Sequence, residues 1–254
     1  MADLAGMAEL ATPRLPGTVY LIGAGPGAAD LITVRGARLL ALANVVLHDA
    51  LVTPEMLALC PQAIKIPVGK RSGQRSAAQS FINEQIIASA QLHALVVRLK
   101  GGDPMLFGRA DEEMTALEQA GIPFEIVPGI TTALAAAASV RQPLTKRGVA
   151  RSVALFTSST APGEDAETRL PDCDTLVQYM GGKEALLTAH RMLAAGHPPT
   201  LPIVVIENCS RTNEASQHMT LAELALGLPV CEGPVLVMMG EAMRQRDGLK
   251  SNSE

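Results

Sequence analysis

A glycine-rich turn, which joins an apolar segment to a helical pattern, carries the first residues able to do chemistry. Residues 94–99 are typical of a buried strand, and the chain then turns at Gly101 and Gly102. The residues that follow add charged side chains and a rigid proline, namely Asp103, Pro104, Arg109 and Glu112. A simple turn needs only a glycine or two, so the added groups indicate a ligand-binding loop at the carboxyl edge of a sheet.

Two further glycine loops follow apolar segments, at residues 23–27 and 128–132. The first loop has the outline of a dinucleotide-binding fingerprint, with Asp49 as the acid at the end of the next strand. Pro26 argues against that interpretation, because proline removes a backbone N–H from the turn that would hold a pyrophosphate. A turn without a ligand is another alternative. A smooth loop packed against an uncharged edge of a cofactor fits the proline and glycines best.

Cations gather in two places although the formal net charge of the chain is −4. The first group lies within residues 141–151, which contain no acid, and the second within residues 70–75; their members are Arg141, Lys146, Arg147 and Arg151, then Lys70, Arg71 and Arg75. A local excess of cations can focus an anionic substrate into a cleft, and arginines suit carboxylates. The alternative for residues 141–151 is an exposed basic linker.

Arg109 and Glu112 are three residues apart at the start of a helical pattern, where they would share one face. We hypothesise that Arg109 binds a substrate carboxylate and that Glu112 orients the guanidinium. The alternative is an ordinary surface ion pair, worth only ~0.2–0.5 kcal/mol. The five histidines show no ligand spacing, so no metal site is expected.

Composition and charge exclude several classes of protein. The negative net charge gives no bulk attraction to nucleic acid. The four cysteines form no Cys-x-x-Cys pair, so reduced thiols in the cytoplasm are expected rather than disulfides or zinc. Acids interrupt the mildly apolar first 16 residues, so no signal peptide is predicted. No apolar run reaches the ~20 residues that span a bilayer, so no membrane partner is expected.

Strand patterns and helix patterns alternate along the chain, which predicts an α/β fold. Strands are expected over residues 18–22, 45–47, 64–68, 95–99, 124–127, 153–157, 175–179, 203–206 and 235–239. Helices are expected over 33–43, 53–59, 77–91, 110–119, 132–139, 183–195 and 221–226. Largely parallel pairing is predicted for the first half. We predict α/β domains over 17–141 and 150–245, joined through residues 142–151, with a disordered extension over 1–16 and a flexible tail over 246–254.

The order of these motifs resembles the tetrapyrrole methyltransferases over residues 17–245. The resemblance lies in Gly23-Ala24-Gly25-Pro26-Gly27, Asp49, Val68-Gly69-Lys70, Gly101-Gly102-Asp103-Pro104, Phe107-Gly108-Arg109, Val127-Pro128-Gly129-Ile130-Thr131, Pro143-Leu144-Thr145 with Arg147, and Tyr179-Met180-Gly181. Each motif is modest alone, but their order and spacing together are specific.

This resemblance implies two α/β domains with a cofactor cleft between them, unlike the Rossmann-type methyltransferases, and a homodimer. It implies S-adenosyl-L-methionine as the methyl donor and S-adenosyl-L-homocysteine as its product. The implied reaction methylates two ring carbons of uroporphyrinogen III and gives precorrin-2 through precorrin-1. Precorrin-2 is a precursor of siroheme, cobalamin and heme d1.

The resemblance also assigns roles to residues. The implied cofactor-binding positions are Pro26, Gly101, Gly102, Asp103, Leu106, Thr131, Thr132, Met180 and Cys209. Asp49 matches the proton acceptor of the family and Lys70 the proton donor, while Arg109, Glu112 and Arg147 complete the expected catalytic set. Asp103 would hold the ammonium or ribose of the cofactor. Its alternative role is to cap the loop that follows it.

Some positions depart from the family pattern, and two other functions stay open. Ala50 stands where an arginine is usual, Ser139 where an aromatic is common, and Cys209 where the family has glycine. One alternative is a methyltransferase of the same fold that acts on another corrinoid intermediate, on diphthamide or on RNA. The other is a non-catalytic protein that binds a tetrapyrrole or senses the cofactor.

Overall fold

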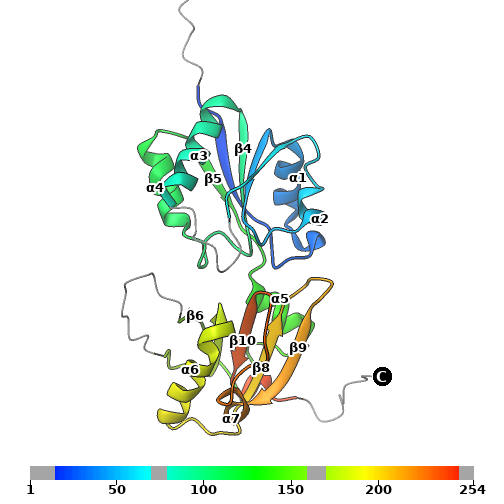
Figure 1. Cartoon of the computed structure of the whole chain (residues 1–254), viewed down its shortest axis with the longest axis vertical. Helices are drawn as coiled ribbons and strands as arrows, with labels where there is room; N and C mark the ends of the chain where they lie inside the picture. Colours follow the sequence, from blue (N-terminus) through cyan, green and yellow to red (C-terminus); the bar gives the residue numbers. More distant parts are fainter. Residues whose placement is uncertain (1–14, 70–78, 159–169, 246–254) are drawn as a thin grey trace, which may run out of the picture. The chain divides into compact units, whose positions relative to one another are not determined.

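The computed structural model describes residues 15–69, 79–158 and 170–245. The chain forms two compact units, each built around its own five-stranded sheet (Figure 1). The first unit contains Ile32–Gly129 and the described residues up to Ala24. The second contains Gly25–Leu31 and the described residues from Ile130 onward. The terminal segments predicted to be disordered lie almost entirely outside the described residues.

The first sheet is wholly parallel, as the alternating pattern predicted. Its strands are β1 (Thr18–Gly23), β2 (Val45–His48), β3 (Ile64–Pro67), β4 (Leu95–Lys100) and β5 (Phe124–Val127). They are arranged in the order β3-β2-β4-β1-β5, which differs from the order 3-2-1-4-5-6 of the Rossmann fold. The parallel arrangement brings the carboxyl ends of all five strands to one edge.

Helices cover both faces of this sheet (Figure 1). The helical segments are η1 (Ala29–Leu31, in the second unit), α1 (Val34–Leu42), α2 (Pro54–Leu57), α3 (Gln79–Leu92) and α4 (Ala110–Gln119). Thr33 and Thr53 cap α1 and α2, since their side chains accept hydrogen bonds from the N–H groups of Gly36 and Met56. Threonine is a favoured residue at this position, which explains why both helices begin here. Helices α3 and α4 pack on one face through a core that includes Val19, Leu21 and Val96.

The order of strands creates a topological switch point between β1 and β4. These neighbours continue in opposite directions, because β1 leads through α1 to β2 and β4 leads through α4 to β5. Since parallel crossovers are right-handed, their helices lie on opposite faces, and the loops after the two strands diverge. Ligands of open α/β sheets bind beyond the carboxyl ends of strands at such a point. The loops after β1 and β4 are two of the three in which the sequence predicted ligand-binding glycines.

The second sheet is mixed. Its strands are β6 (Val153–Thr157), β7 (Thr175–Tyr179), β8 (Pro202–Glu207), β9 (Ala215–Thr220) and β10 (Val235–Met239), in the order β6-β7-β10-β8-β9. Strands β6 and β7 are parallel, and the remaining pairs are antiparallel. Strand β9 was not predicted. Among the described strands it pairs only with β8, as a polar edge strand, and it lacks the apolar alternation that reveals a half-buried strand.

Strand β10 separates two cores in the second unit. Val235, Val237 and Met239 face the core under α6 (Gly181–Ala194) and α7 (Leu221–Leu224). Leu236 and Met238 face the opposite core, which contains the alanines of α5 (Thr132–Ser139) and Met243 of η2 (Glu241–Met243). This alternation follows from the two-residue period of a strand.

Helix α5 groups with the second unit, since the chain passes from the first unit to the second after Gly129. The sequence placed the junction later, at residues 142–151. Ala133, Ala136 and Ala137 of α5 are buried with Leu236 and Met238 of β10, and this packing joins the helix to the second sheet. In the described part of the chain, no helix is both long and apolar enough to cross a membrane.

Candidate active site

Three glycines let the loops after β1, β4 and β5 approach one another closely. A Cβ atom on Gly23 would lie 2.5 Å from the Cα of Gly129 and 2.7 Å from the carbonyl oxygen of Gly102. A Cβ on Gly129 would lie 2.3 Å from the same oxygen. Gly102 also has a φ of +68°, which favours glycine, and the space beside it is open. The glycines therefore permit close backbone contact at the switch point and leave free space beside Gly102.

Asp103 fixes the geometry of this junction. One carboxylate oxygen accepts a hydrogen bond of 2.8 Å from the N–H of Met105, and the other accepts one of 2.8 Å from the N–H of Gly129. The backbone N–H of Leu106 donates to the carbonyl of Asp103 in the same turn. The contacts are those of the loop-capping role that sequence reasoning left open. Each oxygen keeps a second lone pair that a ligand can use.

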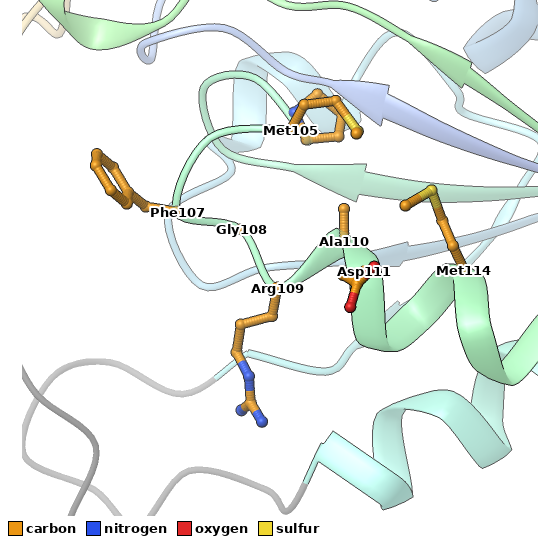
Figure 2. A pocket seen from close by; sticks show the side chains of 8 residues that line it. Met105, Phe107, Gly108, Arg109, Ala110, Asp111 and Met114 are labelled. Carbon is orange, nitrogen blue, oxygen red and sulfur yellow. The ribbon is translucent and has the colours of Figure 1, made fainter. Parts of the chain in front are cut away.

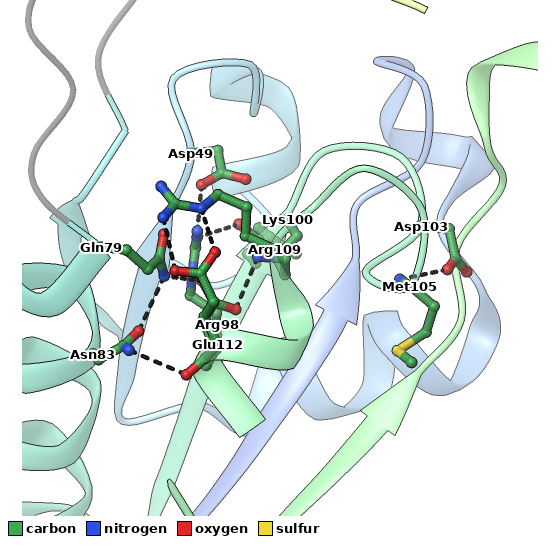
Figure 3. Close-up of polar contacts among 11 residues, drawn as sticks. Asp49, Gln79, Asn83, Arg98, Lys100, Asp103, Met105, Arg109 and Glu112 are labelled. Atoms are coloured by element: carbon green, nitrogen blue, oxygen red, sulfur yellow. Dashed lines mark hydrogen bonds and ion pairs between the residues drawn. The ribbon is translucent and has the colours of Figure 1, made fainter. Parts of the chain in front are cut away.

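A buried charge cluster, formed by Asp49, Arg98, Lys100 and Glu113, lies beside the carboxyl end of β4 (Figure 3). The guanidinium of Arg98 donates from Nη2 to Asp49 at 2.5 Å and from Nε to Glu113 at 2.9 Å. The ammonium of Lys100 donates to the other oxygen of Glu113 at 2.8 Å. Gln79 of α3 also donates to Glu113. The cluster thus links β2, β4 and two helices.

Asp49 is the most exposed member of this cluster. Its side chain is 30% exposed, whereas those of Arg98, Lys100 and Glu113 are only 1–3% exposed. Asp49 follows β2, and its backbone N–H donates to the carbonyl of Leu99 on the neighbouring β4. The predicted proton acceptor is therefore accessible to solvent, while the charged residues that hold it are buried. Lys70, the predicted proton donor, lies outside the described residues.

Burial lowers the pKa of both cations of the cluster, Arg98 and Lys100, whereas pairing with the carboxylates raises it. Burial disfavours the charge of Arg98, but Asp49 and Glu113 outweigh it and raise the pKa of the guanidinium. Burial, followed by the nearby charge of Arg98, lowers the pKa of Lys100, and Glu113 only partly offsets this. The lysine is thus the less securely charged of the two cations.

Arg109 and Glu112 form a bidentate ion pair next to the cluster. Nε and Nη2 of Arg109 donate to the two oxygens of Glu112, each at 2.7 Å. The side chains are 54% and 46% exposed, which matches the surface pair of the alternative interpretation. Arg109 has a left-handed φ of +55°, a strained conformation that is common at functional sites. Asn83 of α3 donates to the carbonyl of Glu112 and holds this end of α4.

A small pocket of about 260 Å³ lies in the loop that precedes α4. Its lining is largely apolar and consists of Pro104, Met105, Phe107, Gly108, Arg109, Ala110, Asp111 and Met114. Figure 2 shows the side chains of Phe107 and Arg109 extending from the loop away from Met114. Phe107 shares the left-handed conformation of Arg109, with a φ of +52°. The loop therefore offers an apolar surface beside a cation with free donors.

In the second unit, Tyr179 organises the start of α5. Its hydroxyl lies 2.5 Å from the hydroxyl of Thr131 and accepts a hydrogen bond of 3.1 Å from the N–H of Ala133. Thr131 and Thr132, both predicted to bind a cofactor, are partly exposed at this helix start. Met180 follows Tyr179, has a left-handed φ of +56° and is half-exposed. Three of the predicted cofactor residues are thus held by one strand end and one helix start.

Cys209 lies beside the first glycine loop. A Cβ on Gly27 would lie 3.2 Å from the carbonyl oxygen of Cys209, and the N–H of Ala28 donates to Ser210 Oγ at 3.0 Å. Pro26 belongs to the same loop. Glu214 accepts a hydrogen bond from the N–H of Ser210 at 2.5 Å. The structure thus places the loop that contains Pro26 beside the backbone of Cys209 and Ser210.

Cys209 should be unreactive in the folded protein. Burial, with a smaller contribution from Glu214, raises the pKa of its thiol to about 12, so almost no thiolate is present near neutral pH. We expect iodoacetamide at pH 7.5 to leave the Cys209 peptide unmodified in the folded chain and to modify it in urea. Peptide mass spectrometry measures both states. Modification of Cys209 as fast as that of the partly exposed Cys173 would contradict this.

Arg147 lies apart from the other predicted residues of the second unit. It lies in a tight turn in which the backbones of Lys146 and Ala150 are paired. The nearby carbonyl of Leu144 accepts a hydrogen bond from Thr175, at the start of β7. Met180 follows the opposite end of that strand. Within this unit, Arg147 and Met180 therefore lie near opposite ends of β7.

The sequence analysis gave no role to four residues of the site, namely Arg98, Lys100, Glu113 and Tyr179, although Tyr179 stands in one of the family motifs. A signal for two of them was present. Arg98 and Lys100 are two residues apart in an otherwise apolar strand, so both side chains point to one buried face and require anionic partners. The sequence alone does not identify those partners. In the described ranges, no group of three or more His, Cys, Asp or Glu is arranged to hold a metal ion.

Comparison with known proteins places this arrangement in a family. A family description, "Tetrapyrrole (Corrin/Porphyrin) Methylases", matches residues 18–225, a range that includes both sheets up to β9. The chain belongs to the tetrapyrrole methylase family. The resemblance inferred from the glycine loops is thereby confirmed. The match also agrees with a strand order that is not of the Rossmann type.

Individual members of the tetrapyrrole methylases extend this finding. The chain is 42% identical to "Siroheme synthase 2" of Yersinia pestis over 234 residues, which cover 91% of this chain and 50% of that protein. The chain thus spans about half the length of the curated relatives it matches. The solved uroporphyrin-III C-methyl transferase of Thermus thermophilus, complexed with S-adenyl homocysteine, is 38% identical with a TM-score of 0.77. That match covers 90% of this chain and 94% of the other. A cobalt precorrin-4 methyltransferase matches at 27% identity and a TM-score of 0.77, over 90% and 96% of the two chains.

Proposed function

We propose that this chain transfers methyl groups from S-adenosylmethionine to two ring carbons of uroporphyrinogen III, giving precorrin-2 through precorrin-1. The observation that carries the proposal is the match to the Thermus thermophilus methyltransferase, at 38% identity over 94% of that enzyme. The support within the chain is Asp49, a partly exposed carboxylate at the ligand-binding edge of the first sheet. Arg109 beside it supplies a cation for a substrate rich in carboxylates.

The proposed cofactor residues suit S-adenosylmethionine chemically. They are Pro26, Gly101, Gly102, Asp103, Leu106, Thr131, Thr132, Met180 and Cys209, and they include one carboxylate and no cation. Such a lining favours a ligand with a positive sulfonium centre. The open space beside Gly102 leaves room for a ligand against the backbone. When bound, S-adenosylmethionine supplies an electrophilic methyl group.

The chain's own contribution is to position the reactants and to accept a proton. A ring carbon takes the methyl group with its own π electrons, and the electron pair of the broken C–S bond stays on sulfur. The methylated ring system then releases a proton, which Asp49 accepts in our proposal. Holding the reactants in line provides most of the rate enhancement for such a transfer. In this proposal Arg109, oriented by Glu112, and Arg147 bind substrate carboxylates, and Lys70 acts as proton donor.

We include in the proposal a homodimer, which the family resemblance supports, and a cytoplasmic location, which the cysteine pattern favours. Sedimentation of the purified chain measures the dimer directly. If the chain still sediments as a monomer at micromolar concentration, the proposed dimer is contradicted.

Anaerobic incubation with uroporphyrinogen III and S-adenosylmethionine tests the proposed reaction. We expect a product that has gained two methyl groups, detected by mass spectrometry and by its absorbance. The match to a cobalt precorrin-4 methyltransferase favours a second candidate, the methylation of another corrinoid. No gain of methyl on uroporphyrinogen III, together with transfer to a later corrinoid, would favour that candidate. Binding of both ligands without any transfer would favour a binding protein.

A further inference from the structure

The buried charge cluster contains more charge than is needed to hold Asp49. One arginine would suffice to bind that carboxylate, yet Lys100 and Glu113 extend the cluster inward from Arg98. Neither residue is exposed by more than 3% at its side chain, and neither contacts Asp49 directly. Charges are rarely buried at this depth unless they are paired, because removal from water is costly. The second pair therefore requires an explanation.

Charge balance supplies that explanation. Arg98 and Lys100 carry two positive charges, and Glu113 carries one negative charge at the same depth. The buried part alone therefore has an excess positive charge, which the ionised Asp49 neutralises. Glu113 binds both cations, one through each oxygen, so it also fixes the direction in which Arg98 points.

We propose that Glu113 and Lys100 are positioning residues that act through Arg98 to set the orientation and the charge environment of Asp49. The proposal rests on the proposed function, because it assumes that Asp49 is the proton acceptor. Glu113 holds the guanidinium edge of Arg98 so that Nη2 faces Asp49. Lys100 neutralises Glu113, so that the carboxylate of Glu113 does not add a net negative charge beside Asp49.

The other polar and charged groups near Asp49 come from β2, α4 and α3. Asp49 follows His48 on β2, and the ring of His48 contacts the carbonyl of Asp49 at 3.1 Å. Arg109 and Glu112 of α4 interact electrostatically with Glu113 and Lys100 respectively. In the described part of α3, the neutral amide of Gln79 donates to Glu113, and that of Asn83 donates to the backbone carbonyl of Glu112. Because these groups stay unchanged in the variants below, differences between the variants come from Lys100 and Glu113.

The test uses the full chain with Glu113→Gln, Lys100→Met and the double variant E113Q/K100M. The single variants leave the cluster with an excess positive or an excess negative charge, and the double variant restores neutrality. We expect the acidic limb of the kcat–pH profile to move down by about one pH unit in E113Q and up by about one unit in K100M. That size is the order expected for one charge at an effective dielectric constant of about 20. In the double variant the limb should return close to that of the unmodified chain.

A merely structural role predicts a different pattern. Both single variants would then lose stability and active protein without moving the limb, and the double variant would be worse than either. Limbs that stay fixed, or that move in the same direction in both single variants, overturn the proposal. The control is Glu118→Gln, which removes an exposed carboxylate from the same helix and should leave the profile unchanged.

A second measurement does not depend on methyl transfer. Urea unfolding of Asp49→Asn, Lys100→Met and D49N/K100M tests whether the two charges compensate. We expect K100M to raise the urea midpoint of D49N, since the double variant keeps one buried arginine opposite one glutamate. Independent, additive losses would overturn the charge balance even if the enzyme is active. Compensation without any methylation of uroporphyrinogen III would refute the proposed function and leave the charge coupling supported.

Discussion

Asp49→Asn lowers kcat for methylation of uroporphyrinogen III by about two to four orders of magnitude, the usual range for the loss of a positioned acid or base. Asparagine has nearly the same shape as aspartate, and its amide oxygen can still accept the 2.5 Å hydrogen bond from Arg98. That amide oxygen is far too weak a base to accept a proton near neutral pH. The substitution therefore removes the proposed chemical role of Asp49 and largely retains its packing.

Three measurements distinguish this result from unfolding or loss of the cofactor. Steady-state kinetics gives kcat, calorimetry gives the affinity for S-adenosylhomocysteine, and circular dichroism reports the fold. We expect that affinity to change less than threefold, because Asp49 is not among the proposed cofactor residues. Glu55→Gln, at an exposed position on α2, serves as the control and should keep full activity. A kcat for D49N within threefold of the unmodified value would exclude Asp49 as the proton acceptor.

The helices and strands of the first unit were largely predictable, because the sequence signals that define each element lie within it or next to it. The caps Thr33 and Thr53 each sit beside the helix that they begin, and buried parallel strands are nearly continuous apolar runs. The glycine loops could be predicted for the same reason, because each directly follows the apolar run of its strand. Strand β9 could not be found this way, because its residues are polar and it is defined only by pairing with β8.

The candidate site was only partly predictable, because its central contacts are long-range. Arg98 lies 49 residues from Asp49, and Asp103 lies 26 residues from Gly129. The positions of Asp49 and Asp103 at strand ends were evident from the sequence. Their partners depend on the strand order, which places β2 beside β4 and β5 beside β1. A charged residue inside an apolar strand indicates that a partner exists, but only the fold determines which residue it is.

Arg109→Lys provides the second large effect, and the chain contains a matched control for it. We expect kcat/KM for uroporphyrinogen III to fall by about 10- to 100-fold, the loss of one charge-assisted contact worth roughly 1.5–3 kcal/mol. The guanidinium has five donors, and Nε and Nη2 already hold Glu112, which leaves the Nη1 edge for a substrate carboxylate. An ammonium group has no planar fork and cannot bind both carboxylates in this way.

Arg244 and Glu241 form an equivalent pair at η2 of the second unit, and neither residue has a role in the proposed site. They are also three residues apart, are bidentate at 2.8 and 2.7 Å, and have side chains 56% and 46% exposed. Arg244→Lys should therefore cost the same few tenths of a kcal/mol in stability as Arg109→Lys, since both are exposed pairs. Only Arg109→Lys should change kcat/KM, and the affinity for S-adenosylhomocysteine should stay constant in both. Equal kinetics for the two variants would show that Arg109 and Glu112 are a surface ion pair, and the carboxylate-binding role would then have to pass to the cations of residues 141–151.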